Sequence, residues 1–304
     1  MNETSKKPYL FSIAGVLLAS LILLLVGSFC DKQIAIAMFD SDSYFGRIGA
    51  GYGQFPIYVA LLSVGMLLFL GRRKDKVWLL VIEYIASIAL VGFAFYNFMF
   101  NPIKYRTGIH LAFTIPFGAI FGLALVFLEY KFFKDLDKKL LLKVPLATLV
   151  AIAIEIGIWF LIKSLWGRPR PYIMFEVSQD YFVNWWEAGR GFSIKSMISP
   201  DILKFPSEYN DYFCSFPSGH TSNATLILFL LPTLGELKPS LKKYRPLLVL
   251  SAFAWVMFVA FSRLNIGAHY LSDVSMAILI SGSLGMLTFY FFFLRTPKSA
   301  ISKA

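Results

Sequence analysis

The stretch VPLATLVAIAIEIGIWFLIKSLWGRPRP, residues 144–171, decides the fold class of this chain. Its first part, 144–163, is apolar apart from one threonine, one glutamate and the closing Lys163. A helix needs about 20 such residues to cross the hydrocarbon core of a bilayer. The stretch then turns polar at once, with three basic residues in KSLWGRPRP (163–171). A long apolar run that ends in positive charge is typical of a membrane span and its flank.

The rest of the chain repeats this pattern. Of its 304 residues, 57% are hydrophobic and only 15% are charged, so the chain is more apolar and less charged than an average soluble domain. We therefore predict an all-α fold, a polytopic integral membrane helical bundle of about eight transmembrane helices that forms a single integral domain. Of the eight predicted spans, the sixth, 220–235, is the shortest and contains Pro232. The eight predicted spans are 9–28, 54–70, 78–99, 109–128, 144–163, 220–235, 246–263 and 272–294.

The positive charges of the chain gather in every second connection between the predicted spans. The net charge is +11, but this alternating distribution is typical of topogenic charge, and we expect no nucleic-acid partner. With eight spans and an uncleaved first span, the basic connections share one side with both termini, and the positive-inside rule assigns that side to the cytoplasm. Five segments hold 18 of the 29 lysines and arginines, namely Lys6 with Lys7, 71–76, 131–143, 238–245, and the tail residues Arg295, Lys298 and Lys303.

The two cysteines, Cys30 and Cys214, both fall on the outer side in this topology. An oxidising compartment permits a disulfide between them. Two unrelated thiols near a membrane interface are an equally good interpretation, and both alternatives stay open.

Polar residues of the outer side concentrate at three places where spans begin or end. The longest connection, 164–219, lies on this side, and a loop of that length is more often functional than filler. Segment 163–171 leaves the fifth span, PSGH (217–220) enters the sixth, and SRLNIGAHYLSD (262–273) joins the seventh to the eighth. Two of the three histidines lie in these segments. Because charge at membrane depth is costly, the three segments together form one candidate site.

The residue types in these segments suit a phosphate group. Lys163, Arg170 and Arg263 offer three positive charges, and the planar fork of arginine matches the oxygens of a phosphate. Ser218 and Gly219 precede an apolar run, at a helix start where free backbone N–H groups favour an anion. Each residue alone also has a structural interpretation, as an interfacial basic side chain or a helix N-cap. Their occurrence on one side favours a phosphate-binding site.

The two histidines supply reactive groups. His220 and His269 provide a nucleophile and a proton donor, and Asp273 is within reach of the His269 imidazole if the intervening turn is helical. Two histidines and one aspartate without cysteine pairs do not make a typical zinc site, so we predict neither a metal nor another cofactor. The basic residues then stabilise the charge that develops on phosphorus.

These segments resemble the signature of the type 2 phosphatidic acid phosphatase superfamily, lipid phosphate phosphatases that are also similar to vanadium haloperoxidases. That signature is a lysine, six residues and Arg-Pro, then Pro-Ser-Gly-His, then Ser-Arg, five residues, a histidine, three residues and an aspartate. The chain matches its order and spacing from Lys163 to Asp273, and three linked motifs are far more specific than one. Only the family's spacing selects Arg170-Pro171 over the preceding Arg168-Pro169.

The resemblance implies a role for each matching residue. His269 attacks phosphorus to give a phosphohistidine, and Asp273 holds its imidazole. His220 protonates the leaving oxygen and later activates water. The residues that bind the phosphoryl oxygens are Lys163, Arg170, Ser218, Gly219 and Arg263.

The resemblance also divides the chain. Members of the family commonly have six spans, and the first motif leaves the third; here it leaves the fifth. Residues 144–304, with the extracytoplasmic loop 164–219, therefore form the phosphatase core, which places the catalytic core in the last four spans. Residues 1–143 hold about four spans without a readable motif, about two more than the family requires.

The resemblance implies a multi-pass enzyme of a plasma or bacterial inner membrane that hydrolyses a lipid phosphate monoester or diphosphate on the extracytoplasmic face without a metal. Its partners are then the lipid phosphate and the bilayer. Phosphatidic acid, phosphatidylglycerol phosphate, an isoprenyl diphosphate and a lipid A phosphate all remain candidates. Two alternatives stay open: a phosphotransferase that passes the phosphoryl group to another lipid or sugar, and a non-catalytic transporter or scaffold that binds anionic headgroups. Nothing in the sequence indicates an oligomeric state.

Overall fold

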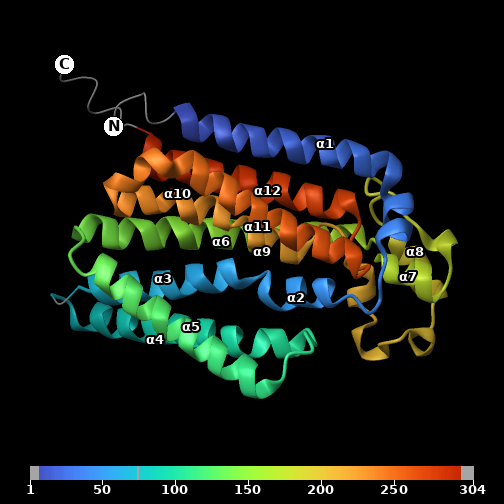
Figure 1. Cartoon of the computed structure of the whole chain (residues 1–304), viewed down its shortest axis with the longest axis horizontal. Helices are drawn as coiled ribbons and strands as arrows, with labels where there is room; N and C mark the ends of the chain where they lie inside the picture. The colour runs from blue at the N-terminus through green and yellow to red at the C-terminus, as the bar shows by residue number, and fades with distance from the viewer. Residues whose placement is uncertain (1–6, 74, 296–304) are drawn as a thin grey trace.

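The computed structural model describes residues 7–73 and 75–295, and every regular element within them is a helix. The long helices run side by side along one axis (Figure 1). Among the described residues, seven segments are long and apolar enough to cross a membrane. The prediction of a polytopic helical bundle is therefore confirmed. The seven segments are Pro8–Met38, Tyr44–Gly71, Val77–Lys104, Leu111–Phe133, Lys138–Glu176, Pro239–Asn265 and Leu271–Leu294.

Within these segments, seven long helices form the body of the bundle, and four of the segments also contain a shorter element. Two of these elements are the short helix α2 (Tyr44–Tyr52), which precedes α3, and η7 (Tyr290–Leu294), which continues α12. The long helices are α1 (Lys7–Met38), α3 (Phe55–Gly71), α4 (Val77–Lys104), α5 (Leu111–Phe133), α6 (Lys138–Trp166), α11 (Arg245–Asn265) and α12 (Leu271–Phe289).

The sixth predicted span, 220–235, forms two short helices in place of one long helix. These are α9 (Gly219–Thr225) and α10 (Ile227–Leu237). Leu226 separates the two helices, and the backbone N–H of Phe229 donates to the carbonyl of Leu226 at 3.0 Å, which is a tighter turn than the α-helical one. The pair still passes through the bundle and packs on α11 and α12 (Figure 1). With this divided segment, the part of the chain that the structure describes crosses the bundle eight times.

The two ends of the bundle carry different segments. The start of α1, the end of α12, the α3–α4 and α5–α6 connections and η6 (Pro239–Tyr244) lie at one end (Figure 1). The short helices α7 (Pro171–Glu176) and α8 (Arg190–Met197) lie at the other end. The basic segments of the sequence therefore gather at the first end. Four of their lysines lie outside the described residues, namely Lys6, Lys74, Lys298 and Lys303.

The hairpin of α4 and α5 lies on the outside of the bundle and packs on α2 and α3. Small residues allow this close approach. A Cβ on Gly118 of α5 would lie 2.5 Å from the carbonyl oxygen of Phe98 in α4, and one on Gly65 of α3 would lie 3.0 Å from the carbonyl oxygen of Ser87 in α4. Without this hairpin, six crossings remain and the Lys163 motif leaves the third. This is the order of spans that the resemblance implies for the family, with α4 and α5 as the two additional spans.

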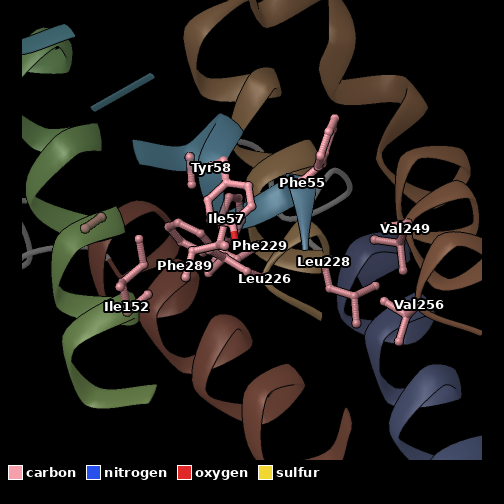
Figure 2. Packing of buried hydrophobic residues seen from close by; sticks show 14 of the residues in the cluster. Phe55, Ile57, Tyr58, Ile152, Leu226, Leu228, Phe229, Val249, Val256 and Phe289 are labelled. Atoms are coloured by element: carbon pink, nitrogen blue, oxygen red, sulfur yellow. The ribbon is translucent and has the colours of Figure 1, made fainter. Parts of the chain in front are cut away.

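Buried apolar side chains from α1, α3, α4, α6, α10, α11 and α12 fill the centre of the bundle. Figure 2 shows Leu226, Phe229 and Phe289 lying together between the helices. Leu226 lies between α9 and α10, so the break in the divided span is itself packed in the core. On the lipid side, large apolar residues such as Phe29 of α1 and Phe113 of α5 are exposed, as expected of helices that face hydrocarbon.

The outer connection, 164–219, is folded and has an apolar core of its own. This segment contains α7, α8 and four short 3₁₀ turns, η2 (Gln179–Tyr181), η3 (Pro200–Ile202), η4 (Pro206–Glu208) and η5 (Asp211–Phe213). We call it the outer cap. Because its turns pack on one another, the cap holds a fixed shape over the end of the bundle. The buried core residues of the cap are Ile173, Val183, Ile194, Ile198, Leu203, Tyr212 and Phe213.

Candidate active site

The three motif segments meet at one cavity of about 520 Å³ between the outer cap and the helix ends. We call it the motif cavity. A second cavity of about 460 Å³, the outer cavity, adjoins it and shares Arg106, Arg170 and Tyr172 with its wall. Asp273 and Ser218 are fully buried and are not among the residues that line the motif cavity. Six predicted site residues line the motif cavity: Lys163, Arg170, Gly219, His220, Arg263 and His269.

The turn after α11 brings Arg263 and His269 together. The helix ends at Asn265, and Gly267 then takes a positive φ of 71°, which a residue with a Cβ adopts only with strain. The chain folds back so that the backbone N–H of His269 donates to the carbonyl of Arg263 at 3.3 Å. The spacing of this motif is therefore the length of one tight turn around the end of a helix.

The imidazole of His269 has a fixed tautomer. Its Nδ1 lies 2.7 Å from the carbonyl oxygen of Ser215. A carbonyl only accepts, so Nδ1 carries the proton and Nε2 keeps its lone pair. Asp273, expected to hold the ring, is further away, with Oδ2 at 3.6 Å from Nδ1. Burial, together with the charges of Arg170 and Lys163, lowers the pKa of His269 to about 3, so the ring is neutral.

Ser215, which was not among the predicted site residues, joins His269 to Asp273. Its hydroxyl donates to Oδ2 of Asp273 at 2.5 Å, and its backbone N–H donates to the carbonyl of Arg168 at 3.0 Å. Its own carbonyl accepts from His269. The carboxylate of Asp273 also accepts from the backbone N–H of Tyr270 at 2.8 Å. Asp273 thus orients His269 chiefly through the loop that carries Ser215.

Arg168 and Arg170 have different positions in the structure. In the sequence, only the spacing of the family's motif favoured Arg170 as the phosphate-binding residue. Arg168 has a fully buried side chain and lies beneath the cavity, between two carboxylates. Its Nη1 is 2.5 Å from Oδ1 of Asp273, and its Nη2 is 2.9 Å from Oδ2 of Asp31. Arg170 lines the cavity instead. Arg168 is therefore a support for Asp273, and Arg170 is the residue available to a ligand.

Asp31 of α1 was not predicted as part of the site. It is nearly fully buried and also accepts from the backbone N–H of Ser272 at 3.0 Å and from the Ser272 hydroxyl. A signal was present in the sequence, because Asp31 is a lone carboxylate near the end of the first apolar run. Buried charge at this depth is a functional hypothesis by default.

Arg170 is held in place by Asp211 of the outer cap. Its Nε donates to the backbone carbonyl of Asp211 at 2.7 Å, and its Nη2 donates to the carboxylate at 2.9 Å. Burial raises the pKa of Asp211, but the charges of Arg170 and Lys163 outweigh it and leave this pKa below its ordinary value. Lys163 donates to the carbonyl of Cys214 and lies 5.0 Å from the ring centre of Trp159.

Several buried polar atoms around the cavity have no hydrogen-bond partner among the described residues. They are Nε2 of His220, Nε of Arg263 and Nε1 of Trp159, and all three residues line the motif cavity. Nearly all buried polar groups in proteins are paired. A group of unpaired atoms around one cavity therefore indicates the place of a polar ligand. The ring of Tyr105 lies against His220, with 4.8 Å between ring centres.

In the Pro-Ser-Gly-His segment, Ser218 and Gly219 have different structural roles. The hydroxyl of Ser218 accepts from the backbone N–H of Thr221 at 3.3 Å and from the Thr221 hydroxyl at 3.0 Å, so it caps α9. Gly219 lines the cavity, and a Cβ there would lie 2.7 Å from Nε1 of Trp159. The capping interpretation thus applies to Ser218, whereas Gly219 leaves space beside the tryptophan.

Cys30 and Cys214 are both free thiols. Of the two alternatives for the cysteines, the structure therefore has unrelated thiols. Cys214 contributes its backbone carbonyl to Lys163, and its side chain donates to the carbonyl of Asn210 at 3.3 Å.

Comparison with known proteins agrees with the predicted family. The profile of the PAP2 superfamily matches residues 144–297. Phosphatidylglycerophosphatase B of Haemophilus influenzae is 28% identical to the chain over 139 residues, which are 42% of this chain and 57% of that relative. No solved structure matches the chain. The superfamily profile covers half of the chain and spans every motif residue around the cavity, from Lys163 to Asp273, and the protein therefore belongs to the PAP2 superfamily.

Proposed function

We propose that this protein is a membrane lipid phosphatase that hydrolyses a phosphate monoester or diphosphate of a lipid through a phosphohistidine on His269. One observation carries the proposal: a neutral His269 of fixed tautomer shares a cavity with the unpaired Nε2 of His220 and with three basic side chains. A transporter or scaffold for anionic headgroups needs the basic residues but not these two histidines. The family and the relative named phosphatidylglycerophosphatase B support the same assignment.

The first step forms the covalent intermediate. The lone pair on Nε2 of His269 attacks phosphorus, and the bond from phosphorus to the lipid oxygen breaks. His220, in its protonated form, donates a proton to that oxygen as it leaves. In the second step, neutral His220 takes a proton from water, the water oxygen bonds to phosphorus, and the bond from phosphorus to His269 breaks. Inorganic phosphate leaves, and both histidines return to their starting states.

Positive side chains of the cavity stabilise the charge on the phosphoryl oxygens. Lys163, Arg170 and Arg263 line the same wall as His269, and fixed charges in a site sheltered from water cost no reorganisation during the reaction. Gly219 leaves room for the phosphoryl group beside the start of α9. Ser218 contributes by capping that helix start. We therefore propose that the reaction needs no metal ion.

The proposed setting is a plasma membrane or bacterial inner membrane, with the cavity on the extracytoplasmic side and both termini in the cytoplasm. The basic connections at the opposite end of the bundle support this orientation. The cavity lies at the ends of apolar helices, where the phosphate of a membrane lipid is found without leaving the bilayer. The lipid phosphate and the bilayer are thus the proposed partners.

The experiment is a phosphate-release assay on the purified protein with phosphatidic acid, phosphatidylglycerol phosphate and farnesyl diphosphate. We expect phosphate release that survives EDTA. His269→Ala should lose turnover and form no phosphoenzyme. His220→Ala should lose about 10²–10⁴-fold on lipid monoesters but less on p-nitrophenyl phosphate, whose leaving group needs little protonation. The matched control is His110→Asn, because His110 is exposed and caps α5, and asparagine also caps helices.

Three results would contradict the proposal. Loss of activity on chelation with recovery on adding magnesium would reject the metal-free mechanism. An acid-labile phosphoryl label on His220 in place of His269 would reverse the two roles. Transfer of the phosphoryl group to an added lipid or sugar, with no release to water, would establish the phosphotransferase alternative.

A further inference from the structure

The connection between α4 and α5 adds two basic side chains to the motif cavity. Lys104 ends α4 and Arg106 follows it, and both line the cavity beside Arg170 and His220. They lie outside the region that matches the superfamily, residues 144–297. The hairpin that forms the two additional spans thus reaches the proposed site.

This connection is held firmly against α2. The side chain of Asn101 donates to the carbonyl of Gly51 at 2.7 Å. A Cβ on Gly51 would lie 2.5 Å from Cγ2 of Thr107, so the two segments are in close contact. Arg106 has a positive φ of 49°, uncommon for a residue other than glycine. Its guanidinium lies 4.6 Å from the ring centre of Phe205 in the outer cap. The side chain therefore joins the hairpin to the cap across the cavity.

The charge of the motif cavity exceeds what one phosphate needs. Five basic residues line it against two acidic ones, Glu208 and Asp211, and Asp211 is already paired with Arg170. Within the described part of the chain, neither Lys104 nor Arg106 forms an ion pair. Two positive charges thus remain beside the three that the reaction uses.

The outer cavity, which adjoins the motif cavity, contains a further basic side chain beside Arg106, that of Arg47. Arg47 of α2 lines it together with Arg106, and its buried Nε has no hydrogen-bond partner among the described residues. An unpaired buried guanidinium nitrogen in a cavity wall is a site for an anion. In the outer cavity as a whole, basic and acidic residues balance, so the surplus of positive charge belongs to the motif cavity. The basic residues of the outer cavity are Arg47, Arg106, Arg170 and Lys204, and the acidic ones are Asp42, Glu176, Glu208 and Asp211.

We propose that Lys104 and Arg106 form a second phosphate subsite and that the substrate is a lipid with a second phosphate beside the one that is cleaved. The inference rests on the proposed function and narrows it. The second phosphate has two chemical sources: the neighbouring phosphate of a lipid diphosphate, or the phosphodiester of a glycerophospholipid whose headgroup ends in a phosphate monoester. Both present an anion close to the scissile group.

The test uses two substrate pairs that differ only by this second phosphate or the headgroup that carries it. These are farnesyl diphosphate against farnesyl phosphate, and dioleoyl phosphatidylglycerol phosphate against dioleoyl phosphatidic acid. For each pair, the measured quantity is the ratio of kcat/KM values in the wild type, in Arg106→Gln, in Lys104→Gln and in the double variant. Arg190→Gln is the matched control, since Arg190 is an exposed arginine of the outer cap paired with Glu187.

We expect the ratio to fall about tenfold in Arg106→Gln for at least one pair, because a charge-assisted hydrogen bond to the second phosphate is lost. The ratio in Arg190→Gln should stay at the wild-type value. A fall confined to the farnesyl pair identifies the diphosphate source, and a fall confined to the glycerolipid pair identifies the phosphodiester.

An unchanged ratio for both pairs in the double variant would overturn the inference alone. An equal fall in Arg190→Gln would also overturn it, because a general field effect would then explain the result. If the wild type releases phosphate from none of the four lipids, the proposed function is overturned, and this inference with it.

Discussion

At the scale of single residues, the position of His269 depends on groups that do not touch a substrate. The carbonyl of Ser215 accepts a hydrogen bond from Nδ1 of His269. The hydroxyl of Ser215 and the guanidinium of Arg168 both donate to the carboxylate of Asp273. Arg168 is buried, and its guanidinium has more N–H donors than one carboxylate can accept. Asp31 supplies a second carboxylate. The geometry of the nucleophile is thus fixed by a chain of buried polar contacts that begins on α1.

The first prediction at this scale concerns Asp31. Asp31→Asn keeps the size of the side chain but removes a charge from the pair with Arg168. We expect Arg168 to bind Asp273 more closely and to disturb its contact with Ser215, so kcat falls about tenfold while KM changes little. Loss of a charged hydrogen-bond partner of buried Arg168 also lowers the free energy of unfolding by about 1–3 kcal/mol. Steady-state kinetics and thermal unfolding in detergent measure both effects.

The control for Asp31 is Asp40→Asn, because Asp40 is exposed and lies nearby in the chain. Asp31→Glu should recover part of kcat, since it restores the charge. Equal kcat values for Asp31→Asn and Asp40→Asn would show that Asp31 has no part in positioning His269.

At the scale of elements, the site is built where helices end. The end of α6 supplies Lys163, the capped start of α9 supplies Gly219 and His220, and the turn after α11 supplies His269. The α4–α5 connection adds a fourth helix end to the same cavity. Because the position of that connection depends on how tightly the hairpin packs, small residues between helices matter for the cavity as well as for stability.

The prediction at this scale concerns the glycine at the α4–α5 contact. In Gly118→Ala, the new methyl group would lie 2.5 Å from the carbonyl oxygen of Phe98. We expect the helices to separate and the free energy of unfolding to fall by about 1–3 kcal/mol, as for other overpacked sites. Gly92→Ala on α4 is the matched control, since nothing lies within 4 Å of a Cβ there. Thermal unfolding in detergent compares the two, and equal stability would contradict the packing argument.

At the scale of the whole molecule, one end of the bundle is basic and the other carries the outer cap and both cavities. A membrane with a potential and anionic cytoplasmic lipids favours a single orientation for such a chain. The orientation in turn decides which leaflet presents its lipid phosphates to the cavity.

The prediction at this scale is the orientation itself. In a background of Cys30→Ser and Cys214→Ser, we expect Gln179→Cys of the outer cap to react with a membrane-impermeant maleimide in intact cells. Ser240→Cys, at the basic end, should react only after permeabilisation. Both positions are exposed in the structure, so access to solvent does not favour either one. The reverse labelling pattern would place the cavity in the cytoplasm.

The sequence by itself determined the membrane bundle, its spans and the residues of the three motifs. These are local properties: the length of an apolar run, the charge of a connection, and the spacing of Arg263 and His269, which is one turn at a helix end. The sixth span was predicted as one helix, because hydropathy does not register the break at Leu226 between α9 and α10.

Only the tertiary structure decided how those residues divide their tasks. It assigned Arg170 to the cavity and Arg168 to the interior, and it brought in Asp31, which lies 137 positions from Arg168 in the chain. It also brought Arg106 to a wall shared with Arg170. The physical reason is that a buried charge is stable only beside its partner, and which distant helix supplies that partner follows from packing rather than from any local pattern.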